Sequence, residues 1–144
     1  MRILLVDDEV SSDPAFRPGH YMWYYANALR KADHALTVID NVDDAVEWLQ
    51  ENGADVDCII LDVLMPPGKS FRGHPDVKEG TNSGYLLAQK LPSIVDNVPV
   101  VALTHLLGED TERLSGLPNV QCVLSKHDCT PKRLVEVLHR IVIK

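Results

Sequence analysis

The stretch MRILLVDD (residues 1–8) decides the fold, because an unbroken aliphatic run ends directly in two carboxylates. An apolar run without polar alternation is typical of a strand that is buried on both faces of a sheet. Three later runs also end in a polar side chain: CIILD (58–62) in Asp62, VPVVALT (98–104) in Thr104 and VQCVLSK (120–126) in Lys126. In an open parallel sheet, functional groups lie just beyond the carboxyl ends of the strands. We therefore expect these polar side chains to meet at one edge.

The rest of the chain alternates short apolar runs with amphipathic stretches, which predicts a parallel sheet with helices on both faces. This pattern favours a doubly wound (βα)5 flavodoxin-like α/β fold, whose usual strand order is 2-1-3-4-5. The expected strands are residues 2–7, 36–39, 57–62, 98–104 and 119–125. The expected helices are residues 20–33, a helix capped by Asn41 or Asp43 that ends at Asn52, and residues 84–91, 108–116 and 131–142.

Two connections are unusually long for this fold, residues 9–19 and 63–83, and both are rich in turn-forming residues. Long loops within a compact domain are uncommon and are often functional. Both connections leave the carboxyl edge of the predicted sheet, so we expect them to overhang the polar side chains there.

The composition excludes several classes of function. The 144 residues fit one domain, and 14 Lys and Arg against 21 Asp and Glu give a net charge of −7. This charge argues against direct binding to nucleic acid or to an anionic membrane surface. No apolar stretch approaches the roughly 20 residues that a membrane span needs. Three cysteines without CxxC spacing indicate reduced thiols, so we expect a cytoplasmic protein.

The polar side chains at the strand ends suggest phosphoryl chemistry. Clustered carboxylates repel one another and need a cation, and the oxygens of Asp7, Asp8 and Asp62 suit Mg2+. A carboxylate beside a metal can attack a phosphoryl group and form an aspartyl phosphate. The charge that develops on the phosphoryl oxygens needs an ammonium group and hydrogen-bond donors, which match Lys126 and Thr104 by type and position.

Four motifs occur in order at these strand ends: VDDE (6–9), LDVLMP (61–66), ALT (102–104) and LSK (124–126). The ordered set resembles the receiver domain of two-component response regulators, and the resemblance covers nearly the whole chain. It implies that Asp62 accepts a phosphoryl group from a histidine kinase or a phosphotransfer protein.

The same resemblance implies a role for each of the other residues at the strand ends. Asp8 would bind Mg2+ directly, Asp7 would bind it largely through water, and the backbone carbonyl of Leu64 would complete the protein ligands. Thr104 would hydrogen-bond the phosphoryl group and move inward on activation, and Lys126 would pair with that group.

The sequence departs from the receiver pattern at several positions. The aromatic switch residue three positions before the lysine is replaced by Val123, which lacks a ring to report the movement of the threonine. The usual cis proline after the lysine is replaced by His127, so we expect a trans peptide bond there. The small residue after the threonine is replaced by His105, which would narrow access to the acceptor. With Leu64 and Leu106 beside the acceptor, we expect a long-lived phosphoryl group.

Three functions compete at this point. The first is a single receiver domain over residues 1–144, without an output domain, that signals to a downstream protein and is no enzyme beyond its own phosphorylation and dephosphorylation. The alternative is a phosphorylation-independent pseudo-receiver that uses the pocket as a protein-binding surface. A phosphatase with an aspartyl nucleophile would need an acid two positions after Asp62, where Leu64 stands. The sequence names no kinase or target and leaves open whether the domain forms a homodimer.

Overall fold

The computed structural model describes residues 1–9, 21–65, 68–71, 83–105 and 109–142. Most of the two long connections predicted at residues 9–19 and 63–83 lies outside this part of the chain. Five strands lie within it: β1 Arg2–Val6, β2 Ala35–Ile39, β3 Cys58–Leu61, β4 Val100–Thr104 and β5 Val120–Ser125. They form one parallel sheet in the order β2-β1-β3-β4-β5, which confirms the predicted fold class and strand order.

Helices follow the strands where the amphipathic stretches predicted them. They are α1 Tyr21–Lys31, α2 Val42–Asn52, α4 Ser83–Lys90, α5 Glu109–Ser115 and α6 Pro131–Val142, with short 3-10 turns η1 Gly53–Asp55 and η2 Leu91–Ser93. The caps of α2 explain where that helix starts, because the Asn41 side chain accepts a hydrogen bond from the backbone N–H of Asp44 at 2.8 Å. No helix in the described part of the chain has the length and apolar character needed to span a bilayer.

One short helix was not predicted. The four-residue helix α3, Gly68–Phe71, lies in a connection that the sequence indicated to be a loop. A contact with α2 stabilises this helix: the backbone N–H of Lys69 donates a hydrogen bond to Asp43 Oδ2 at 2.8 Å. Gly68 has a φ of 59°, and a Cβ there would lie 2.3 Å from the same carboxylate. A tertiary contact of this kind leaves no periodic signal in the sequence.

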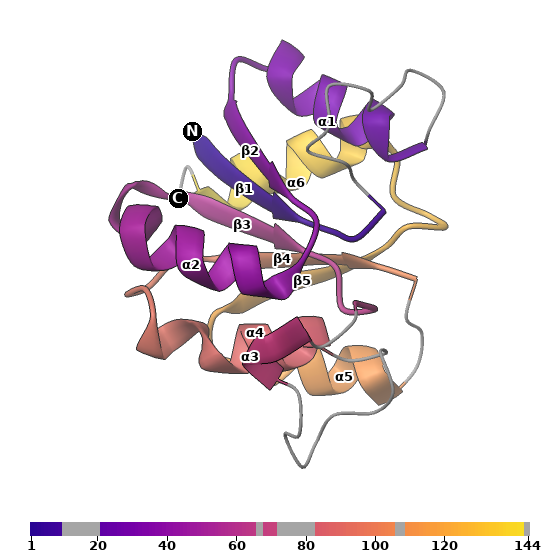
Figure 1. The fold of residues 1–144 in the computed structure, drawn as a ribbon. Coiled ribbons are helices and arrows are strands. Elements are labelled where there is room, and N and C mark those ends of the chain that lie inside the picture. Colours follow the sequence, from indigo (N-terminus) through magenta and orange to yellow (C-terminus); the bar gives the residue numbers. More distant parts are fainter. Residues whose placement is uncertain (10–20, 66–67, 72–82, 106–108, 143–144) are drawn as a thin grey trace.

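The core has two apolar layers, one on each face of the sheet. Helices α1 and α6 cover one face, and α2, α4 and α5 cover the other (Figure 1). Successive strand residues point to opposite faces, so Ile3 and Leu5 on β1 pack under α1 and α6, whereas Leu4 and Val6 pack under α2 and α4. Burial on both faces is why these strands show no polar alternation.

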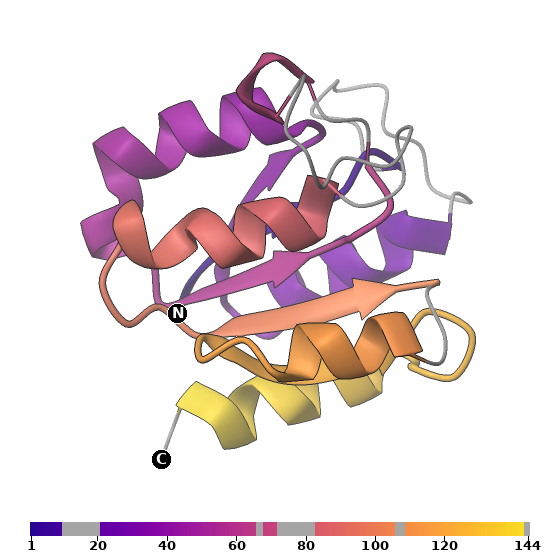
Figure 2. The same cartoon turned by 90° about the horizontal axis from the view of Figure 1, so that it is seen from below.

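The view from below shows the strands running side by side between the two helical layers (Figure 2). On α1 the predicted inward residues Met22, Tyr25, Ala26 and Leu29 are all buried. Pro131 starts α6, where a missing N–H leaves no hydrogen bond unmade. The helices thereby fix the strands, and the strands bring their carboxyl ends to one edge.

Helix α4 packs against the residues that follow β3 at very short range. A Cβ on Gly84 would lie 2.0 Å from the Asp62 carbonyl oxygen and 2.5 Å from Val63 Cα. The N–H of Gly84 donates to the Val63 carbonyl at 3.1 Å, and the hydroxyl of Ser83 donates to the Met65 carbonyl. The start of α4 is therefore anchored, backbone against backbone, to the segment that carries Asp62.

We expect Gly84→Ala to lower the free energy of unfolding by about 2–3 kcal/mol, because the added methyl group overlaps backbone atoms that cannot move aside alone. Urea denaturation of both proteins measures the difference. Gly116→Ala is the matched control, since its nearest contact would be an ordinary 3.4 Å and its effect should stay within about 0.5 kcal/mol. Equal effects of the two substitutions would contradict the close approach of α4.

Candidate functional site

Four strands deliver the predicted polar residues to the carboxyl edge of the sheet. Asp7 follows β1, Asp62 follows β3, Thr104 ends β4 and Lys126 follows β5. Sheet-like hydrogen bonds fix three of these backbones: Asp7 N to the Ile39 carbonyl (3.1 Å), Asp62 N to the Val6 carbonyl (2.9 Å) and Lys126 N to the Thr104 carbonyl (2.9 Å). The parallel register therefore holds the polar residues level with one another.

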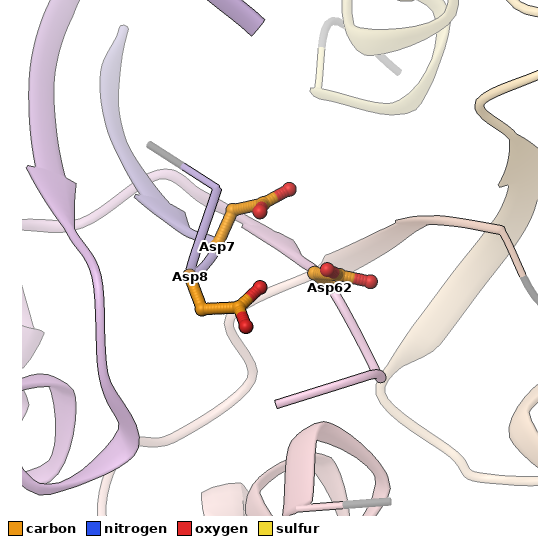
Figure 3. Close-up of side chains that lie close together, drawn as sticks. All are labelled: Asp7, Asp8 and Asp62. Carbon is orange, nitrogen blue, oxygen red and sulfur yellow. The ribbon is translucent and has the colours of Figure 1, made fainter. Parts of the chain in front are cut away.

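The carboxylates of Asp7, Asp8 and Asp62 come together at this edge (Figure 3). Each offers an oxygen, and these oxygens lie within 4.8 Å of one another. Asp7 and Asp62 are buried, with 1% and 3% of their surface exposed, whereas Asp8 is exposed. Such a set of hard oxygen atoms, open on one side, is the donor set that Mg2+ prefers.

Lys126 places its ammonium group among these carboxylates. Its Nζ lies 2.7 Å from Asp7 Oδ2, 2.8 Å from Glu9 Oε2 and 3.3 Å from Asp62 Oδ2. The Lys126 side chain is 0% exposed, so water does not screen these contacts. The buried ammonium of Lys126 therefore pairs with Asp7 and Glu9, which follow β1, and with Asp62, which follows β3.

Glu9 is the site residue that the sequence analysis missed. It follows the Asp7-Asp8 pair directly, and its backbone N–H donates to Asp7 Oδ1 at 2.8 Å, which turns the chain back toward the pocket. The resulting ion pair joins Glu9 to Lys126, a residue 117 positions further along the chain. An acidic residue at the end of VDDE was visible in the sequence, but its partner was not.

The charges of the site perturb one another. Burial and the neighbouring Asp62 raise the pKa of Asp7 to about 7, although Lys126 opposes the shift. Burial, Asp62 and Glu9 likewise raise the pKa of Asp8. Burial disfavours the charged form of Lys126, but Asp62 and Asp7 outweigh it and raise the pKa of the ammonium. Lys126 thus stays charged, whereas Asp7 and Asp8 are harder to ionise than ordinary aspartates.

Solved structures with the same architecture include receiver domains. One is a response regulator receiver domain protein from Clostridium thermocellum, with a TM-score of 0.70 and 17% identity over 99% of this chain and 94% of that chain. Another is the receiver domain of the sensor histidine kinase PA1611 from Pseudomonas aeruginosa PAO1, which has a magnesium ion coordinated in its active site cleft. Its TM-score is 0.68, with 20% identity over 99% of this chain and 98% of that chain. This chain has the receiver-domain fold.

A third receiver-fold structure is a response regulator protein from Burkholderia pseudomallei with a phosphorylated aspartic acid, a calcium ion and citrate. Its TM-score is 0.64, with 15% identity over 95% of this chain and 65% of that chain. No family model matches the sequence, and no curated protein matches it significantly. The fold is therefore shared far more strongly than the sequence.

Val123, which stands where receivers usually carry an aromatic residue, packs beside a tyrosine from another element. Val123, at the switch position, is half-buried and packs with Ala102 in a cluster that also contains the ring of Tyr85 from α4. The guanidinium of Arg113 lies over that ring, 5.1 Å from its centroid. This cluster thus receives an aromatic ring from a neighbouring helix. Thr104, which we expected beside the phosphoryl group, is fully buried at the end of β4.

Of the residues expected to surround the acceptor, Leu64 and His105 lie in the described part of the chain. Leu64 is half-buried, and its N–H donates to Asp62 Oδ1 at 3.3 Å. His105 follows β4 and is half-exposed. The described residues contain no cis peptide bond, so the bond between Lys126 and His127 is trans, as expected. Leu106 lies outside the described residues.

The raised pKa of Asp7 predicts a pH-dependent stability of the metal-free receiver fold. Between its ordinary value of 3.8 and about 7, Asp7 is ionised in the unfolded chain but protonated in the folded one. The folded state then binds more protons, so its stability falls as the pH rises through this window. Relative to Asp7→Asn, the wild type should lose about 3 kcal/mol of unfolding free energy between pH 5 and pH 8.

Urea denaturation in the presence of EDTA at several pH values measures this difference. The histidines are present in both proteins, so their contributions cancel in the comparison. Lys126 stays charged in both states, because its ordinary pKa is already 10.5. A difference between the two proteins that does not change with pH would contradict the raised pKa of Asp7.

Proposed function

We propose that this protein is a response regulator receiver that accepts a phosphoryl group on Asp62 from a histidine kinase or a phosphotransfer protein. One observation carries the proposal: the buried Asp62 carboxylate lies 3.3 Å from a buried ammonium and within 4.8 Å of two further carboxylates. This arrangement stands at the carboxyl edge of a receiver fold, where the chemistry of open parallel sheets is located.

The donor set fits a magnesium ion. Asp7, Asp8 and Asp62 supply hard oxygen atoms. Burial and the neighbouring Asp62 raise the pKa values of Asp7 and Asp8 although Lys126 lowers them, and a divalent cation would favour the charged carboxylates. In this proposal these three carboxylates and the backbone carbonyl of Leu64 hold Mg2+. A bound Mg2+ would neutralise charge on the phosphoryl oxygens. The Pseudomonas receiver domain with magnesium in its cleft supports this choice of ion.

Asp62 is the nucleophile of the proposed reaction. A carboxylate oxygen of Asp62 forms a bond to phosphorus while the bond between phosphorus and the donor imidazole nitrogen breaks, and the electron pair of that bond leaves with the imidazole. The product is an acyl phosphate on Asp62. The Lys126 ammonium pairs with the phosphoryl oxygens, and the Thr104 hydroxyl donates a hydrogen bond to them. The Burkholderia response regulator with a phosphorylated aspartic acid supports this chemistry.

The output in this proposal is a change in protein contacts. Residues 1–144 act as one receiver domain that signals to a downstream protein target and performs no reaction beyond its own phosphorylation and dephosphorylation. The three cysteines are free thiols, which suits the proposed location in the cytoplasm.

A phosphorylation-independent pseudo-receiver is the second candidate. One observation favours it: the Lys126 ammonium is closest to Asp7 (2.7 Å) and Glu9 (2.8 Å), so the pocket already contains a cation that pairs with its carboxylates. A pocket closed in this way would serve as a fixed surface for a protein partner.

Intact-mass spectrometry after incubation with Mg2+ and acetyl phosphate tests the proposal. We expect a single phosphoryl adduct on the wild type and no adduct on Asp62→Asn. When EDTA is present during the incubation, the wild type should form no adduct either. Asp96→Asn is the matched control, because Asp96 is an exposed carboxylate outside the acidic cluster and should leave the adduct unchanged.

The decay of the adduct then measures the lifetime of the phosphoryl group, which we expect to be long because Leu64 and His105 provide no carboxylate or amide to position water. An adduct that persists in Asp62→Asn would overturn Asp62 as the acceptor. No adduct from either acetyl phosphate or a phosphohistidine-containing protein would support the pseudo-receiver.

A further inference from the structure

Two histidines at the carboxyl edge face each other through ring nitrogens. His105 follows β4 and His127 follows β5 by two residues. His105 Nδ1 lies 3.3 Å from His127 Nε2, the ring centroids are 4.8 Å apart and the ring planes are tilted by 55°. His127 is exposed and His105 half-exposed, so an ion from solution can reach both rings.

The distance between the two nitrogens fits a shared transition metal. A tetrahedral zinc with bonds to nitrogen of about 2.0–2.1 Å separates two nitrogen ligands by roughly 3.3–3.4 Å. The pair thus supplies two ligands at the right spacing, and water would complete the coordination. Imidazole nitrogens select zinc, copper or nickel, whereas the carboxylates of the neighbouring cluster select magnesium.

Glu9 supports the His105 ring from the other side. Glu9 Oε2 lies 3.8 Å from His105 Nε2, the nitrogen that does not face His127. The negative charge on that side favours the tautomer with its proton on Nε2, in which Nδ1 is the nitrogen that would bind the metal. Carboxylates placed behind histidine ligands in this way orient the ring and increase its basicity as a ligand.

A second histidine pair in the fold has a cation, not a carboxylate, at hydrogen-bond distance from the other nitrogen of one ring. His34 and His139 have their Nε2 atoms 3.1 Å apart, but their ring centroids are 5.2 Å apart. The Met1 amino group lies 3.3 Å from His34 Nδ1, so a cation stands where Glu9 supports His105.

We propose that His105 and His127 form a binding site for a transition-metal ion such as Zn2+, with Glu9 positioned behind His105. The site is distinct from the magnesium ligands, because it uses imidazole nitrogens from the ends of β4 and β5. Asp62 contributes no ligand to it.

Isothermal titration of the full chain with Zn2+, in the presence of excess Mg2+ to occupy the acidic cluster, tests the site. We expect one zinc ion per chain and no such binding to His105→Ala or His127→Ala. Glu9→Gln should bind zinc about tenfold more weakly, as observed when the partner behind a metal-bound histidine is removed. His34→Ala/His139→Ala is the matched control and should bind like the wild type.

Two further measurements separate this site from the alternatives. The imidazole nitrogen signals of His105 and His127 in long-range proton–nitrogen NMR spectra should shift on addition of zinc, and those of His34 and His139 should not. Asp8→Asn should keep its zinc affinity. Binding that survives in both single histidine variants, or that disappears in Asp8→Asn, would place the zinc elsewhere and overturn the proposal. Circular dichroism checks that each variant is folded.

Discussion

The buried ammonium of Lys126 is the interaction on which the edge of the sheet depends. Asp7 and Asp62 are buried beside each other at adjacent strand ends, and two like charges out of water repel strongly. Lys126 lies 2.7 Å from the first and 3.3 Å from the second, so it makes their joint burial tolerable. A buried ion pair recovers its desolvation cost only when its partners are well placed. The backbone around the three residues therefore has to be held firmly.

Two sets of contacts hold the backbone next to Asp62 and Lys126 in place. The Ser83 hydroxyl and the Gly84 backbone anchor α4 to the residues after Asp62. On the opposite face, the buried Tyr25 hydroxyl of α1 donates to the Cys129 carbonyl, and the N–H of Cys129 donates to the Ser125 carbonyl. These bonds fix the turn between β5 and α6 that carries Lys126. The turn is thus ordered by a hydrogen bond from α1 although no cis proline is present.

The sequence predicted the parts of the fold that depend on local pattern. Apolar runs without alternation identified the strands, helical spacing identified the buried face of α1, and the polar residues at the run ends identified the edge where Asp7, Asp62 and Lys126 meet. It did not predict helix α3, the pairing of Glu9 with Lys126, or that of His105 with His127. Each depends on a contact between segments that are distant in the sequence, and the residue types alone do not specify such partners.

The acidic cluster also shows why a site of this kind is a compromise. Stability alone would favour an apolar residue at Asp7, because its raised pKa means that the folded protein disfavours the charged carboxylate near neutral pH. Carboxylates with perturbed pKa values beside a specific charge partner are frequent at functional sites. An arriving divalent cation would relieve the same repulsion that destabilises the metal-free fold. Part of the free energy of cation binding would then come from the relief of charge repulsion that is already present in the folded protein.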